Sequence, residues 1–127
     1  MTRPSLPMLA LAAAAAVTAT AALAAEPTGT WVRPSTGTQV NFYTCGQALC
    51  GKIVGVKDQS RKATIGTVIL NGATKTGANT WKGSLLNTED GKTYDGHVTL
   101  EGANALKLEG CALAGIVCKG ETWQRMK

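Results

Sequence analysis

The chain has 127 residues, a formal net charge of +5, four cysteines and a single histidine. This length fits one domain with a modest hydrophobic core. The basic residues are scattered and do not cluster with stacking aromatic residues, which argues against nucleic-acid binding.

The N-terminal residues differ sharply from the rest of the chain. A basic residue precedes an Ala-, Leu-, Val- and Thr-rich run over 6–24, which closes on the small-x-small motif Ala22-Leu23-Ala24 that signal peptidase needs. The run is dominated by alanine and is followed by an acidic residue and a proline, so a permanent membrane anchor is the weaker alternative. We therefore expect residues 1–24 to be a cleaved signal peptide and residues 25–127 to form one periplasmic or secreted domain without a stable membrane span.

After a first strand carrying a Gly-Thr-Trp motif, the segment Cys45-Gly-Gln-Ala-Leu-Cys50 joins two apolar runs. It predicts a hairpin with strands over 38–45 and 49–56. Two cysteines separated by four turn-like residues would face each other across the pair, within reach of a disulfide. That bridge would set Phe42 opposite Ile53, and strand parity would place both sulfur atoms on the outer face.

Beyond this hairpin, the polar segment 57–66 reads as a loop, the one we expect to be mobile. The sequence predicts further strands over 67–70, 80–87, 92–101, 105–111 and 119–126. Asp90-Gly91 is a strong two-residue hairpin signal. It predicts that Trp81 faces Leu100 and that one face of the hairpin is almost entirely apolar residues or glycine.

No amphipathic helix is visible in the sequence of residues 25–127, and strands recur with turn signals at short intervals. The prediction is an all-β fold, a small antiparallel up-and-down barrel of about eight strands, since closure removes exposed strand edges. Gly83, Gly96 and Gly110 have inward parity on three successive strands. They would either permit tight curvature or leave space for a ligand.

An even number of cysteines in an exported chain predicts disulfides rather than free thiols. The local pairing, Cys45 with Cys50 and Cys111 with Cys118, is favoured because each pair brackets a short turn-rich segment. Spacings of four and six residues do not match the paired knuckles of a zinc site. We expect neither a metal nor a cofactor.

Several motifs together resemble a bacterial family named domain of unknown function 2147. They are Gly29-Thr30-Trp31, the CGQALCG block, DGKTYDG at 90–96, and LEGC at 108–111 leading to Trp123. The resemblance spans nearly all of residues 25–127 and implies a small exported lipocalin-like β-barrel. It also implies that Arg125 packs across Trp31 and closes one end of the barrel, a cation–π contact. Family members often carry a longer segment where this chain has 57–66, so no site in that segment carries over.

The predicted registry also brings His97 opposite Ser84 and beside Asp95. Outward polar residues on adjacent strands are neighbours by construction, and the sequence has no nucleophile elbow or oxyanion loop. Glu89 and Asp90 are adjacent carboxylates in a predicted turn, where Asp is favoured for its backbone preference. We therefore expect no enzyme activity.

Two functions follow from this fold. The first is a monomeric binding module that holds a small, mostly apolar ligand at the barrel mouth. The residues predicted to line it are Trp81, Leu85, Tyr94, Val98 and Leu100. The alternative is a filled barrel that binds an envelope protein or an anionic polymer through its outer surface, with Lys57, Arg61 and Lys62 contributing charge. An interior cavity of about 300 Å³ or more would favour the first.

Overall fold

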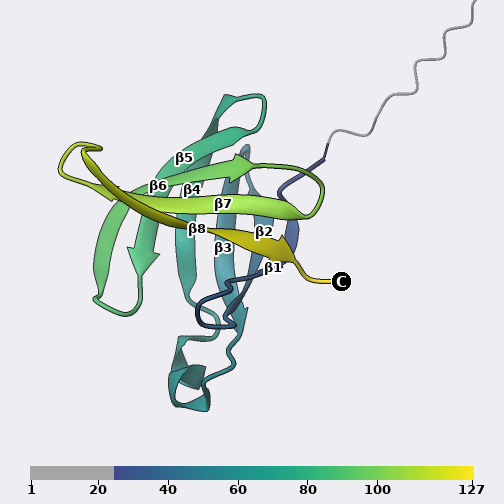
Figure 1. Cartoon of the computed structure of the whole chain (residues 1–127), viewed down its shortest axis with the longest axis vertical. Coiled ribbons are helices and arrows are strands. Elements are labelled where there is room, and N and C mark those ends of the chain that lie inside the picture. Colours follow the sequence, from purple (N-terminus) through teal and green to yellow (C-terminus); the bar gives the residue numbers. More distant parts are fainter. Residues whose placement is uncertain (1–24) are drawn as a thin grey trace, which may run out of the picture.

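The computed structural model describes residues 25–127, so the predicted signal peptide lies outside the described residues. The elements are β1 (Gly29–Val32), β2 (Gln39–Cys45), β3 (Ala48–Gly55), the 3₁₀ helix η1 (Gln59–Thr64), β4 (Val68–Gly77), β5 (Thr80–Asn87), β6 (Lys92–Leu100), β7 (Ala105–Ala112) and β8 (Val117–Arg125). Each strand pairs antiparallel with the next, and β8 returns to β1 to close the barrel (Figure 1). The predicted all-β up-and-down barrel is confirmed.

Because the strands alternate in direction, the connections gather at two ends of the barrel. The closed end holds the start of β1, the end of β8 and the turns β2–β3, β4–β5 and β6–β7. The open end holds the remaining connections, 33–38, 56–67, 88–91 and 113–116.

The closed half is filled by buried side chains. Trp31, Val40, Leu70, Val98 and Leu106 have no exposed surface. Phe42 is also buried, and its ring packs against Gly51, where an added Cβ would stand 2.5 Å from a ring carbon. Only glycine permits this approach of ring to backbone.

The closed end is sealed by Arg125 and Trp31. The guanidinium lies 4.4 Å from the centroid of the indole ring, which is the cation–π contact implied by the family resemblance. Arg125 also donates to the backbone carbonyls of Glu26 (2.6 Å), Thr28 (2.7 Å) and Ala103 (2.7 Å). The indole N–H donates to the carbonyl of Pro27 at 2.9 Å. The same two residues, Trp31 and Arg125, pair across the β1–β8 junction.

The Cys45–Cys50 disulfide is present, but the predicted register around it was wrong by two residues. Phe42 lies opposite Gly51, not Ile53. The reason is a two-residue turn in which Gly46 has φ 68°, so that Cys45 pairs with Ala48 and the two cysteines are diagonal neighbours, 5.8 Å apart at Cα. An even shift leaves every side chain on its predicted face.

The β5–β6 hairpin shows the same shift. Trp81 lies opposite Val98 rather than Leu100. The turn contains four residues, 88–91, because the Gly91 N–H donates to the Asn87 carbonyl at 2.8 Å and Gly91 takes φ 71°. The second disulfide, Cys111–Cys118, lies at the open end and joins directly opposed residues of β7 and β8.

The strand predicted over 67–70 is longer in the structure. β4 continues through Asn71 and Gly72 to Gly77, with a register shift after Asn71 and Gly72 at φ 61°. The predicted loop 57–66 contains η1, whose N-terminus is capped by the Asp58 carboxylate accepting from the Ser60 N–H at 3.0 Å.

The glycines with inward parity form a row, Gly83 opposite Gly96 and Gly96 opposite Gly110. An added Cβ would stand 2.6 Å from the Ala73 backbone at Gly83 and 2.8 Å from the Leu85 Cβ at Gly96. These two glycines therefore serve curvature. At Gly110 the nearest atom would be 3.4 Å away, and this glycine borders a cavity in the open half of the barrel.

Candidate ligand cavity

A cavity of about 720 Å³ occupies the open half of the barrel. Its inner wall is apolar, formed by Ile53, Val56, Ile69, Leu85, Leu108 and Trp123. Its rim is charged, formed by Arg33, Asp58, Arg61, Glu89, Asp90, Lys119 and Glu121. The polarity therefore rises from the inside of the cavity toward its mouth.

Two of the five residues predicted to line a ligand site, Leu85 and Tyr94, border this cavity. The other three do not. Val98 and Leu100 are buried in the closed half, and Trp81 packs against that core. Strand parity shows which way a side chain faces but not at what depth the interior is already filled, so this part of the prediction was wrong.

Arg33 organises one side of the rim. Its Nε donates to Glu121 Oε2 at 2.6 Å and its Nη1 to Glu89 Oε1 at 2.9 Å. Ser35 donates to the same Glu121 carboxylate from its backbone N–H (3.1 Å) and its hydroxyl (2.9 Å). These bonds tie the 33–38 connection to β8 and to the β5–β6 turn.

The charges of this cluster reinforce one another. Burial pushes the pKa of Arg33 down, but the carboxylates of Glu121 and Glu89 outweigh it and the net pKa is raised. Burial pushes the pKa of Glu121 up, but hydrogen bonds from Arg33 and Ser35 outweigh it and the net pKa is lowered. The Arg33–Glu121 pair is thus ionised at neutral pH.

The other rim carboxylates also have partners. The Tyr94 hydroxyl donates to the Asp90 carboxylate, which also accepts from the Lys92 N–H at 2.8 Å. The hydrogen bond lowers the pKa of Asp90 and raises the pKa of Tyr94. Asp58 accepts from both the N–H and the hydroxyl of Ser60, which lowers its pKa.

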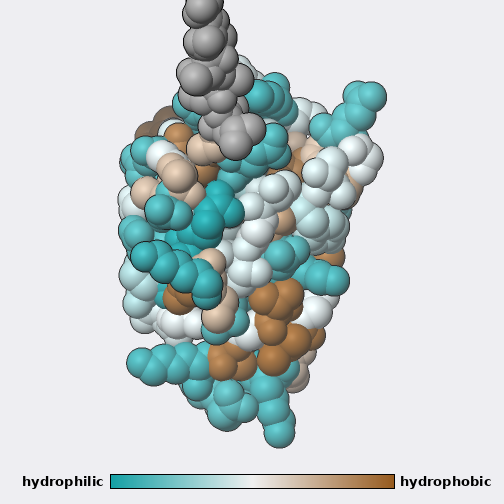
Figure 2. All heavy atoms as spheres, turned by 90° about the vertical axis from the view of Figure 1, so that its right-hand side faces the viewer, coloured by the Kyte–Doolittle hydropathy of each residue, from teal (hydrophilic) through white to brown (hydrophobic). Residues whose placement is uncertain are grey.

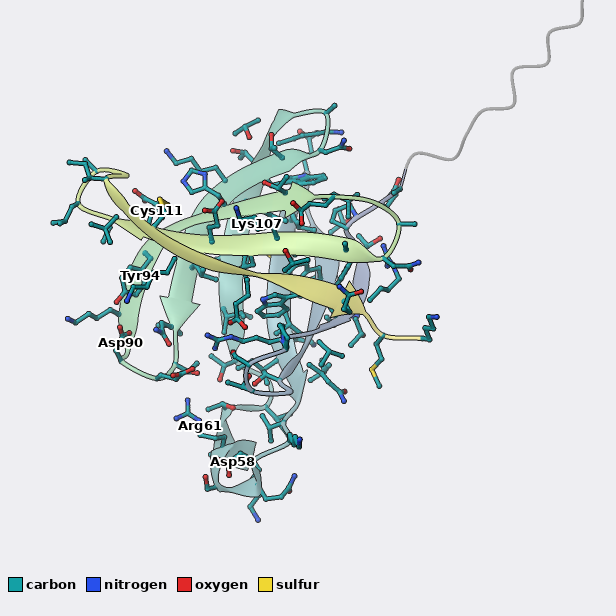
Figure 3. All side chains as sticks on the ribbon, viewed as in Figure 1. Asp58, Arg61, Asp90, Tyr94, Lys107 and Cys111 are labelled. Carbon is teal, nitrogen blue, oxygen red and sulfur yellow. A yellow bond between two sulfur atoms is a disulfide. The ribbon has the colours of Figure 1, made fainter. Side chains whose placement is uncertain are left out.

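Arg61 closes the rim from η1. Its Nη2 donates to the Thr88 hydroxyl at 3.0 Å and so links η1 to the β5–β6 turn. Figure 3 shows Arg61 between Asp58 and Asp90, with Tyr94 further along the same side. The mouth is bordered by parts of the chain that are far apart in sequence.

Sequence reasoning missed Arg33 and Glu121, which lie 88 positions apart and are joined only by the closure of the barrel. The alternation of side chains along the strands did indicate that both residues face inward. Glu121 faces the same way as Trp123 two positions later, and Arg33 the same way as Trp31. A charged residue at an inward position of a barrel strand marks the part of the interior that water or a ligand reaches.

The predicted Ser84–His97 neighbourhood was wrong for the same reason as the register. His97 lies opposite Lys82 and Glu109, while Ser84 lies opposite Asp95. His97 does not border the cavity. Within residues 25–127, no group of three or more His, Cys, Asp or Glu side chains is arranged to hold a metal ion. Within the same range, the structure contains no helix long and apolar enough to cross a membrane.

The model of the family described as "Uncharacterized protein conserved in bacteria (DUF2147)" matches residues 29–125. The solved structure of protein HP1028 from Helicobacter pylori, described as belonging to the lipocalin family, is similar with a TM-score of 0.68 and 22% sequence identity, over 81% of this chain and 84% of that one. No curated protein matches. This chain belongs to the DUF2147 family and has a lipocalin-like fold.

Proposed function

We propose that this protein is a binding module that holds a small, mostly apolar ligand in the open half of the barrel. The observation that carries the proposal is the cavity of about 720 Å³ with an apolar inner wall. Ligand pockets have volumes of roughly 300–1,000 Å³ and are mostly apolar with a few polar groups that fix orientation. The lipocalin-like fold adds support, because such barrels enclose one small ligand.

The cavity also favours ligand binding over the second function expected from the sequence, which acts through the outer surface. A protein that acts only through its outer surface gains nothing from an unfilled interior, whereas its lining is left with fewer packing contacts. Binding rather than catalysis is favoured because the one histidine lies outside the cavity.

The test uses a neutral apolar fluorophore, N-phenyl-1-naphthylamine, whose emission rises on leaving water. We expect saturable enhancement with the wild-type protein. Gly110→Leu should abolish most of it, because the new side chain would project into the cavity from a position where a Cβ meets no atom closer than 3.4 Å. The matched control is Ala78→Leu, which adds the same side chain at an exposed turn of the closed end and should leave binding unchanged.

Failure of the wild-type protein to bind this probe, or equal binding by both leucine variants, would contradict the proposal. Native mass spectrometry of protein purified from its own host provides the complementary measurement. A reproducible adduct that is lost in Gly110→Leu would identify the ligand.

A further inference from the structure

The rim of the cavity carries both positive and negative side chains, but they differ in how far protein groups already occupy them. Each of its four carboxylates already accepts hydrogen bonds from the protein. Glu121 and Glu89 are paired with Arg33, Asp90 accepts from Tyr94 and the Lys92 N–H, and Asp58 accepts from Ser60. Arg33 is likewise committed to its two carboxylates.

Two cations on the rim differ from Arg33. Among residues 25–127, no ion pair includes Arg61 or Lys119. Arg61 is half-buried, and its only hydrogen bond from the side chain to a described residue is the one to Thr88. A guanidinium carries five N–H donors in a planar fork, so most of its capacity is unused. Lys119 is exposed and faces the cavity from β8.

Arg61 is held at the mouth by its backbone. The Thr64 hydroxyl donates to the Arg61 carbonyl at 2.7 Å, the Arg61 N–H donates to the Asp58 carbonyl at 2.9 Å, and the Gly66 N–H ties the end of this segment to Ile53 of β3 at 2.7 Å. The backbone that carries the guanidinium is therefore fixed before binding, and the hydrogen bond to Thr88 restrains the side chain, which favours affinity.

From these contacts, and resting on the proposed function, we propose that the ligand is an amphiphile with an anionic headgroup, such as a carboxylate or phosphate, whose apolar chain fills the cavity and whose headgroup is bound by Arg61. Arginine suits this role because its fork matches the oxygen atoms of either group. Lys119 adds a second positive charge to the same mouth. Neighbouring Asp58 is charged, but its Oδ1 is bound to the N–H and the hydroxyl of Ser60, and no ion pair within residues 25–127 joins it to Arg61.

The test compares two probes with the same ten-carbon chain, decanoate and 1-decanol, by displacement of N-phenyl-1-naphthylamine at about pH 8, where the carboxyl group is ionised. We expect decanoate to bind at least about tenfold tighter, the effect of a charge-assisted hydrogen bond. Arg61→Gln should weaken decanoate about tenfold or more and change 1-decanol by less than about twofold.

Two further variants keep the result interpretable. Lys62→Gln removes the same charge from the neighbouring exposed residue, which does not border the cavity, and should leave both affinities unchanged. Arg61→Lys keeps the charge but not the fork, so part of the preference for decanoate should survive.

Equal affinity for the two probes, equal weakening of both by Arg61→Gln, or an equal effect of Lys62→Gln on decanoate would overturn the inference. In each of these cases the fluorophore still binds, so the proposed function stands. Failure of the fluorophore itself to bind the wild-type protein would contradict both the proposed function and the inference about the headgroup.

Discussion

Each end of the barrel is organised around one arginine, and the two arginines have opposite surroundings. Arg125 at the closed end stacks on a fully buried indole and donates to three neutral backbone carbonyls. Arg33 at the open end is bound to two carboxylates that remain partly exposed. The contacts of Arg125 depend on packing, whereas the ion pairs of Arg33 depend on ionisation and are screened by salt. The closed end is therefore a structural end, and the stability of the open end varies with pH and salt.

Exposed apolar side chains follow the same division. Of the seven large ones described in residues 25–127, only Met126 belongs to the closed end. The other six lie on the open-end connections or the strand ends that lead into them, namely Val54, Ile65, Val68, Leu113, Ile116 and Val117. Figure 2 shows one face of the molecule, mostly hydrophilic, with apolar side chains gathered toward its lower end. The closed end has covered its apolar surface and the open end has not.

The largest effect is expected at the closed end. Trp31→Ala should lower the free energy of unfolding by about 3–5 kcal/mol, since it removes a fully buried ring together with its stacking and hydrogen bond. Urea unfolding followed by circular dichroism measures this. A loss below about 1 kcal/mol would mean that the closed end does not hold the barrel together.

The glycine row tests whether the boundary between filled and open halves is real. Gly83→Ala should cost about 1–3 kcal/mol of unfolding free energy, because the new methyl group would collide with the Ala73 backbone. Gly110→Ala, in the same row, should change stability by no more than about 0.5 kcal/mol. Thermal unfolding of both variants provides the measurement. Equal losses of stability would contradict a boundary between a filled and an open half that lies between Gly83 and Gly110.

Salt dependence should distinguish the two arginines. Arg125→Gln is expected to cost about 1–2 kcal/mol of unfolding free energy at both low and high sodium chloride, since its partners are neutral. Arg33→Gln should cost less at high salt than at low salt, because screening already weakens its ion pairs. Urea titrations of both variants in the two buffers compare them. If Arg125→Gln showed the stronger salt dependence, the assignment would be reversed.

The smallest effect concerns Glu121 and acid. Its pKa in the folded protein lies below the unfolded value of about 4.3. The stabilisation is therefore fully present above that value and is lost as the pH falls through the folded pKa. Glu121→Gln should cost on the order of 1 kcal/mol at neutral pH, and wild type and variant should converge once the pH falls below the folded pKa of Glu121. A gap that stays constant in acid would show that the carboxylate charge is not what stabilises the rim.

The sequence predicted the fold class, the strand order and the inward or outward face of the side chains in the two predicted hairpins, because alternation and turn residues are local features. It did not predict the exact pairing. Both hairpin registers were displaced by two residues. A two-residue and a four-residue turn preserve the same parity, so alternation cannot distinguish them, and in the structure Gly46 and Gly91 take positive φ in the turns that form.

The candidate site was harder to predict from the sequence than the fold. Parity shows that Leu85 and Tyr94 face inward but not that they border the cavity, since Trp81, Val98 and Leu100 were predicted on the same face and do not. The pairing of Arg33 with Glu121 could not be predicted, because the two residues lie 88 positions apart and meet only when β8 returns to β1. Their partnership is a property of barrel closure.

The junction between β1 and β8 has a consequence for how the chain folds. Every other strand pair joins neighbours in sequence and can form by closing a short local loop, whereas this one pairs residues of the first and last strands through only two positions, Trp31 with Arg125 and Val32 with Gln124. Non-local contacts form slowly, because loop-closure entropy must be overcome first. We therefore expect this junction to form late and to open first, so its amide protons should exchange with solvent before those of the β5–β7 meander. Trp31 and Arg125 would then act as the latch that completes the barrel.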